Sequence, residues 1–118
     1  MNKTLKNVLP QDIKPFIDEN VPLIDIRRDD EFQATGIIKG AHKLTFFDEY
    51  GRHDLEKWLA DFKKIVKNKE DKFILVCAHA NRTKTVGDYL ANKLEYTNAY
   101  HLEGGMTLWL DQNKEVVY

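Results

Sequence analysis

The sequence has a single cysteine among its 118 residues, and this scarcity excludes several kinds of site. One cysteine cannot form an intramolecular disulfide, and it cannot supply the several thiolates of a multi-cysteine zinc site. The chain also has no second thiol to resolve a covalent intermediate formed on the first. Any reaction through Cys77 must therefore pass its product to another molecule.

Long apolar segments and an excess of one charge are also missing. The first segment, Met1–Asn20, has no long apolar run, so we expect neither a signal peptide nor a spanning helix, and a cytoplasmic location is the default expectation. The net charge of −1 argues against nucleic acid or membrane as a partner. The densest basic run, Lys63–Lys69, falls on a predicted amphipathic helix and is expected to be a solvated face.

No repeat and no Gly/Ser/Pro-rich linker divides the chain, so one domain is expected over residues 1–118. Strands are predicted at Val21–Ile26, Ala41–Phe46, Phe73–Val76 and Asn98–Leu102. Helices are predicted at Asp29–Thr35, at Leu55–Val66, from near Arg82 to Leu94, and after Gly104-Gly105. In the second of these, Asp54 is expected to be the cap, and Trp58 and Phe62 belong to the apolar stripe that faces the core. In the last, Trp109 is expected in the core or in a pocket wall.

This alternation predicts an α/β fold with a mainly parallel sheet and helices on both of its faces. The run Phe73–Val76 is continuously apolar between charged residues, which is typical of a strand buried on both sides. Ligands of such sheets bind outside the carboxyl ends of the strands. Because Cys77 directly follows this strand, it is expected at the ligand-binding edge.

The residues after Cys77 are small or polar and lead into a helix. Small residues allow consecutive N–H groups to turn inward and bind an anion, and the helix adds its free N-terminal donors. With the charge of Arg82, these groups favour the ionised thiol. Cys77 is therefore the candidate nucleophile; a buried hydrophobe without chemistry is the alternative. The candidate anion-binding residues are Ala78, His79, Ala80, Asn81, Arg82 and Thr83, of which Thr83 is expected to hydrogen-bond locally at the helix start.

The segment Cys77–Thr83 resembles the active loop of rhodanese-type sulfurtransferases, in which four residues separate cysteine from arginine. An upstream signature of that family is similar to Leu23–Arg27, Glu31-Phe32 and Gly36–Ala41 in this chain. The closing motif of the family resembles Gly104-Gly105 with Trp109. The resemblance implies a five-stranded parallel sheet and transfer of sulfane sulfur through a cysteine persulfide. The donor would be thiosulfate or a persulfide and the acceptor cyanide, a thiol or a protein, with no metal or organic cofactor.

Related phosphatases of the cell-division dual-specificity type use the same fold with a loop one residue longer, so the four residues between Cys77 and Arg82 favour sulfur over phosphate. The chain departs from many family members at three positions. It has Ala78 where they carry a cation, Ala80 where they often carry glycine, and Ile37 where they commonly carry histidine. The missing cation weakens the case for thiosulfate as donor, and His79 is expected to contact the substrate in its place.

Other polar residues are expected to support the site rather than react. Asp25 and Arg27 are placed behind it, with Arg27 forming either an ion pair with Glu31 or hydrogen bonds to loop carbonyls. The other histidines lack metal-ligand spacing and are expected to be at the surface or partly buried: His42, His53 and His101. Three functions remain open: a sulfurtransferase, a sulfur-carrier or sensing module with little turnover, and a phosphatase or arsenate-handling enzyme.

Overall fold

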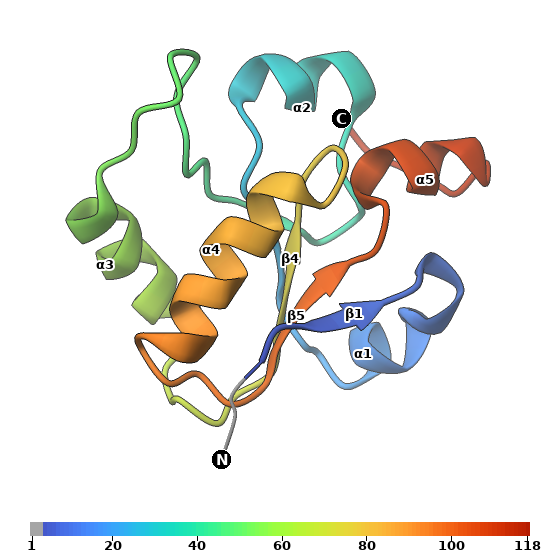
Figure 1. The fold of residues 1–118 in the computed structure, drawn as a ribbon. Helices are drawn as coiled ribbons and strands as arrows, with labels where there is room; N and C mark the ends of the chain where they lie inside the picture. Colours follow the sequence, from blue (N-terminus) through green and yellow to red (C-terminus); the bar gives the residue numbers. More distant parts are fainter. Residues whose placement is uncertain (1–3) are drawn as a thin grey trace.

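The computed structural model describes residues 4–118 and contains one five-stranded parallel sheet (Figure 1). The strands lie in the order β1-β5-β4-β2-β3, and every neighbouring pair is parallel. Their bounds are β1 Lys6–Val8, β2 Leu23–Asp25, β3 His42–Lys43, β4 Phe73–Val76 and β5 Ala99–Leu102. The predicted α/β class is confirmed, as is the five-stranded sheet that the resemblance implied.

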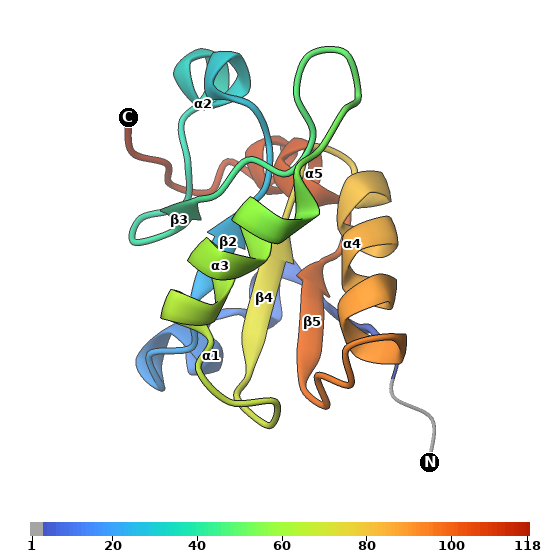
Figure 2. The same ribbon diagram turned by 90° about the vertical axis from the view of Figure 1, so that its left-hand side faces the viewer.

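Helices cover both faces of the sheet, as predicted. Figures 1 and 2 show α3 and α4 on one face and α1 and α5 on the other, with α2 beyond the carboxyl end of the strands. The bounds are η1 Pro10–Asp12, α1 Lys14–Asp18, α2 Asp29–Thr35, α3 Leu55–Ile65, α4 Asn81–Asn92 and α5 Gly105–Asp111. Successive residues of β4 alternate between the two apolar layers: Leu75 packs with Phe62 and Leu90, and Ile74 packs with Leu102.

Several boundaries differ from the sequence prediction. Strand β2 covers Leu23–Asp25 of the predicted Val21–Ile26, and α3 and β5 are each one residue shorter than predicted. Strand β1 was not predicted, because Val8 is its only buried residue and a three-residue edge strand leaves no alternating pattern. Strand β3 covers only His42–Lys43 of the predicted Ala41–Phe46. Helix α4 ends at Asn92 instead of Leu94. None of the helices described is long and apolar enough to cross a membrane.

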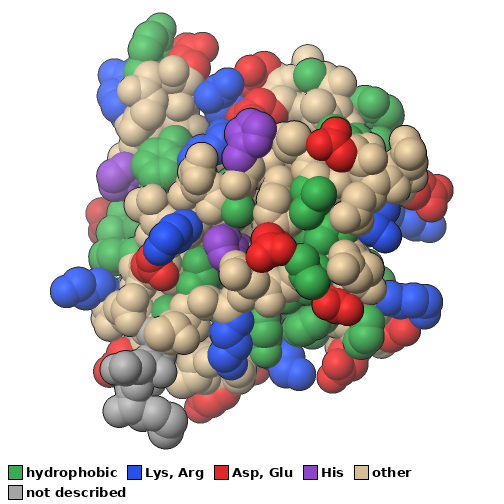
Figure 3. Space-filling model, turned by 45° about the vertical axis from the view of Figure 1, so that its right-hand side comes forward, with side chains coloured by type: hydrophobic (Ala, Val, Ile, Leu, Met, Phe, Trp, Pro, Cys, Tyr) green, Lys and Arg blue, Asp and Glu red, His purple; other side chains and the backbone are tan. Residues whose placement is uncertain are grey.

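Helix α3 is built as its sequence predicts. The side chain of Asp54 accepts a hydrogen bond from the backbone N–H of Lys57 at 3.1 Å, so Asp54 is the cap. Trp58 and Phe62 are buried on the sheet side. The lysines of Lys63–Lys69 are exposed, as expected, although the helix ends at Ile65. On the face seen in Figure 3, acidic and basic side chains are interspersed and hydrophobic side chains form small separate groups.

Candidate active site

Cys77 lies at the carboxyl end of β4, between the two strands that flank β4 in the sheet. Its side chain joins the core layer beneath α4, and the residue is only 1% exposed. The chain then turns through Ala78, His79 and Ala80 into α4, which begins at Asn81. A nucleophile here would lie at the floor of the loop, directly below the first turn of a helix.

The start of α5 holds this loop from behind. Met106 N–H donates to the carbonyl oxygen of Cys77 at 2.7 Å, and Thr107 N–H donates to that of Ala78 at 3.0 Å. The peptide bonds are trans, so the N–H of each peptide points opposite to its carbonyl. The N–H groups of Ala78 and His79 therefore point away from α5.

The loop thus presents a series of free backbone donors. Within residues 4–118, none of the N–H groups of residues 78–83 donates to a protein acceptor. Ala80 has φ of +69°, a left-handed conformation that turns the chain into α4, and the helix dipole adds partial positive charge at the same end. Such donors beside a sulfur atom can stabilise a negative charge that develops on it.

Arg82 is not the free cation that the sequence suggested. Its two terminal nitrogens donate to the two carboxylate oxygens of Glu31, both at 2.7 Å, in a bidentate pair. These bonds raise the pKa of Arg82 and lower the pKa of Glu31. The pair ties α4 to α2 across the mouth of the loop, and Glu31 offsets part of the charge that Arg82 would offer to an anion.

This pair predicts a pH-dependent contribution to stability. Because the folded pKa of Glu31 lies below its ordinary 4.5, the contribution is fully present above pH 4.5 and is lost as pH falls through the lowered value. Glu31→Gln should lower the free energy of unfolding by about 1 kcal/mol at pH 7. Thermal unfolding from pH 7 to 3 should show this difference shrinking below pH 4.5. A constant difference would contradict it, and Glu49→Gln, at an exposed carboxylate, is the control.

The expected Arg27–Glu31 ion pair is wrong, because Glu31 is engaged by Arg82 and Arg27 by Asp25. Arg27 Nε and Nη2 donate to the Asp25 carboxylate at 2.9 and 2.8 Å. Nη2 also donates to the carbonyl of Gly36 at 2.9 Å, as the alternative prediction had it. Asp25 and Arg27 are fully buried and neither hydrogen-bonds to residues 77–83. They brace α2 against β2.

Two further buried side chains connect to Cys77, Thr83 directly and His101 through Thr83. Thr83 Oγ1 lies 3.5 Å from Cys77 Sγ and 2.8 Å from His101 Nδ1, so its hydroxyl bonds to these groups instead of capping α4 as expected. His101 was expected at the surface or partly buried, but it is 8% exposed, and burial lowers its pKa. The missed signal was strand alternation, which places His101 on the same buried face as Ala99.

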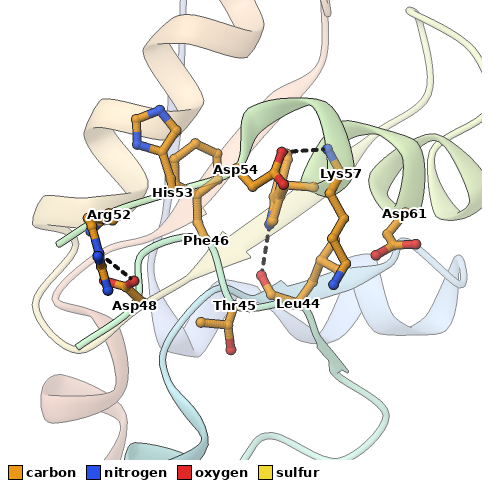
Figure 4. Close-up of a pocket in the computed structure, with 10 residues that line it drawn as sticks. Leu44, Thr45, Phe46, Asp48, Arg52, His53, Asp54, Lys57 and Asp61 are labelled. Atoms are coloured by element: carbon orange, nitrogen blue, oxygen red, sulfur yellow. Dashed lines mark hydrogen bonds and ion pairs between the residues drawn. The ribbon is translucent and has the colours of Figure 1, made fainter. Parts of the chain in front are cut away.

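A separate hollow lies between residues 44–54 and α3 (Figure 4). Its volume is about 360 Å³, and none of its lining residues belongs to the loop 77–83. Asp48 and Arg52 form an ion pair in its wall, and Trp58 Nε1 donates to the Leu44 carbonyl. These groups already bond to one another. In residues 4–118 no cluster of three His, Cys, Asp or Glu side chains could hold a metal.

Comparison with known proteins agrees with this fold. The model of the rhodanese-like domain family matches residues 9–112. The polysulfide-sulfur transferase homodimer of Wolinella succinogenes is 25% identical over 96% of this chain and 78% of its own, with a TM-score of 0.72. A rhodanese-like domain protein of Staphylococcus aureus is 25% identical over 97% of this chain and 100% of its own, with a TM-score of 0.67.

A more distant structure shares only the fold. It is a protein of unknown function from Rhodopseudomonas palustris, described as a possible tyrosine phosphatase, 19% identical over 96% of this chain and 85% of its own, with a TM-score of 0.68. A search of curated proteins gives no match. Because the family model covers most of the sequence and the whole parallel sheet except its first strand, the chain belongs to the rhodanese-like domain family.

Proposed function

We propose that this protein is a sulfurtransferase that carries a sulfane sulfur on Cys77. The observation that carries the proposal is the position of Cys77 beneath the unpaired N–H groups of residues 78–83, because these donors suit an anionic persulfide. The 25% identity to a polysulfide-sulfur transferase supports the same chemistry.

The reaction needs two displacements at sulfur. The Cys77 thiolate attacks the outer sulfur of a donor; the donor's S–S bond breaks, and the leaving group, sulfite in the case of thiosulfate, takes the bonding electron pair. A nucleophilic acceptor, cyanide or a thiol, then attacks the outer sulfur of the persulfide and releases the Cys77 thiolate. Both steps are redox-balanced without a cofactor, and the expected kinetics are ping-pong.

The charges around the loop favour a persulfide donor over thiosulfate. Position 78 carries alanine instead of a cation, and the Arg82 guanidinium is already paired with Glu31. The site therefore compensates the two charges of the compact thiosulfate ion less well than the single charge of a persulfide group. Since the chain has no second cysteine, the acceptor is an external thiol, cyanide or a protein; nucleic acid and membranes are not proposed as partners.

A phosphatase or arsenate-handling enzyme is the less favoured alternative; one structural neighbour is described as a possible tyrosine phosphatase. That neighbour is only 19% identical, so its likeness concerns the fold alone. The loop argues against phosphate, because only four residues separate Cys77 from Arg82. A carrier or sensing module would use the same persulfide with little turnover.

Intact-mass spectrometry tests the proposal. Incubation with thiosulfate or with glutathione persulfide should add one sulfur, about 32 Da, and cyanide or a thiol should remove it. We expect faster loading from the persulfide. Absence of the adduct with either donor would overturn the proposal, and Cys77-dependent hydrolysis of an aryl phosphate would support the phosphatase. An adduct with negligible cyanide turnover would identify a carrier.

A further inference from the structure

Three buried side chains from three different elements form a continuous hydrogen-bonded series. Cys77 follows β4, Thr83 lies in the first turn of α4, and His101 lies in β5. The exposed fractions are 1%, 0% and 8%. Thr83 Oγ1 is the central atom, 3.5 Å from Cys77 Sγ and 2.8 Å from His101 Nδ1. The loop chemistry proposed above does not use His101.

The far end of the series reaches solvent. Among the described residues, His101 Nε2 has no hydrogen-bond partner, yet no buried side-chain nitrogen or oxygen lacks one. His101 Nε2 is therefore accessible to water. The buried thiol and the solvent are thus connected through one hydroxyl and one imidazole ring.

A threonine hydroxyl has one hydrogen, so only two arrangements of this series are consistent. With a thiol, Cys77 S–H donates to Thr83 Oγ1 and the Thr83 hydroxyl donates to His101 Nδ1. With a thiolate, the Thr83 hydroxyl donates to Cys77 Sγ, and Nδ1–H of His101 donates to Thr83 Oγ1. The arrangement that stabilises the anion therefore requires the proton of His101 to lie on Nδ1.

We propose that Thr83 and His101 are a proton relay for Cys77, in which the tautomer of His101 follows the ionisation of the thiol. The Cys77 proton passes to Thr83 Oγ1, the Thr83 hydroxyl proton passes to His101 Nδ1, and the proton on His101 Nε2 leaves to water. One proton is lost overall and the imidazole stays neutral. His101 is a positioning residue that acts through Thr83, and the inference rests on Cys77 being the nucleophile.

The surroundings of His101 agree with a neutral ring. Burial lowers its pKa, and Lys84 of α4 acts in the same direction. Asp88 of α4 and Glu103, which follows β5, act in the opposite direction. The charged neighbours thus oppose one another, and burial, the strongest influence, keeps His101 uncharged at neutral pH.

Alkylation of Cys77 by iodoacetamide, followed across pH, tests the relay without any sulfur donor. His101→Phe should move the midpoint of the profile up by about one pH unit, which is about tenfold slower alkylation at neutral pH. His101→Asn, whose amide can occupy the place of Nδ1, should restore most of the rate. His42→Asn, at an exposed residue of β3, should match the unmodified protein. An unshifted profile in His101→Phe would overturn the proposal.

A double-mutant cycle separates action through Thr83 from a general disturbance of packing. Thr83→Val should shift the profile by itself, and His101→Phe should add nothing to it. Equal shifts in both backgrounds would refute the relay. In the unsubstituted protein, ¹⁵N NMR should show the His101 proton moving from Nε2 to Nδ1 as Cys77 ionises; an unchanged tautomer would also refute it. Failure to load sulfur would instead count against the proposed function.

Discussion

Replacing Cys77 by serine is expected to abolish sulfur loading while leaving the fold intact. Serine differs by one atom, and its hydroxyl can keep the bond to Thr83 Oγ1, so we expect the free energy of unfolding to change by less than about 2 kcal/mol. An alcohol at this position is not ionised and cannot attack sulfane sulfur. Turnover should fall on the order of 10⁴-fold or more, as for other lost nucleophiles.

The measurement combines intact mass, turnover and thermal unfolding on the same samples. Cys77→Ala is the matched control, because it removes the sulfur without adding a hydroxyl to the site. Both variants should lack the mass gain of about one sulfur. A gain that persists in Cys77→Ser would mean that sulfur is carried elsewhere, and the role assigned to Cys77 would be wrong.

Gly105→Ala is expected to have the second largest effect, through both stability and the shape of the loop. Gly105 has φ of +59°, and a Cβ there would clash with the Cys77 carbonyl and lie 2.5 Å from that of Ala78. Both carbonyl oxygens accept hydrogen bonds from the backbone N–H groups of Met106 and Thr107 at the start of α5. They cannot move without breaking these bonds. Left-handed strain and overpacking together should cost about 3 kcal/mol or more.

The loop should also lose its alignment in Gly105→Ala, because displaced carbonyls turn the N–H groups of Ala78 and His79. We expect sulfur loading to slow by at least about tenfold. Gly51→Ala separates the two causes: Gly51 has φ of +77° and open space around its Cα. Gly51→Ala should lower the free energy of unfolding by the left-handed strain alone, about 1 kcal/mol, and should leave sulfur loading unchanged. Equal losses of stability in the two variants, measured by denaturant unfolding, would show that the close contact is unimportant.

Much of the fold follows from local patterns. The apolar run of β4 and the stripe of α3 are strong enough to predict element, burial and cap, because each buries a regular face. Strand β1 could not be found in this way, since its residues gain stability from pairing with β5 rather than from a buried face of their own. The short β3 shows the same limit, as its pattern continues beyond the two residues that pair.

The site was predictable where neighbours in sequence are neighbours in space. Cys77 and the turn into α4 follow from a buried strand, small residues and a helix start. The partners of Arg82 and Arg27 were not predictable in the same way. Arg82 pairs with Glu31, which is 51 residues away in the sequence. Arg27 pairs with Asp25 and not with Glu31, because a buried guanidinium requires a carboxylate within the core.

The sequence by itself determined the alternation of four of the five strands with the helices that follow them, the position of the only thiol at a sheet edge, and the length of its loop. Only the tertiary structure decided what surrounds that thiol. Packing of β5 and α4 on β4 brings Thr83 to Cys77 and His101 to Thr83. The start of α5 binds the carbonyls of Cys77 and Ala78, so these carbonyls point toward α5. Such contacts join residues that are far apart in the chain, so a local sequence pattern does not predict them.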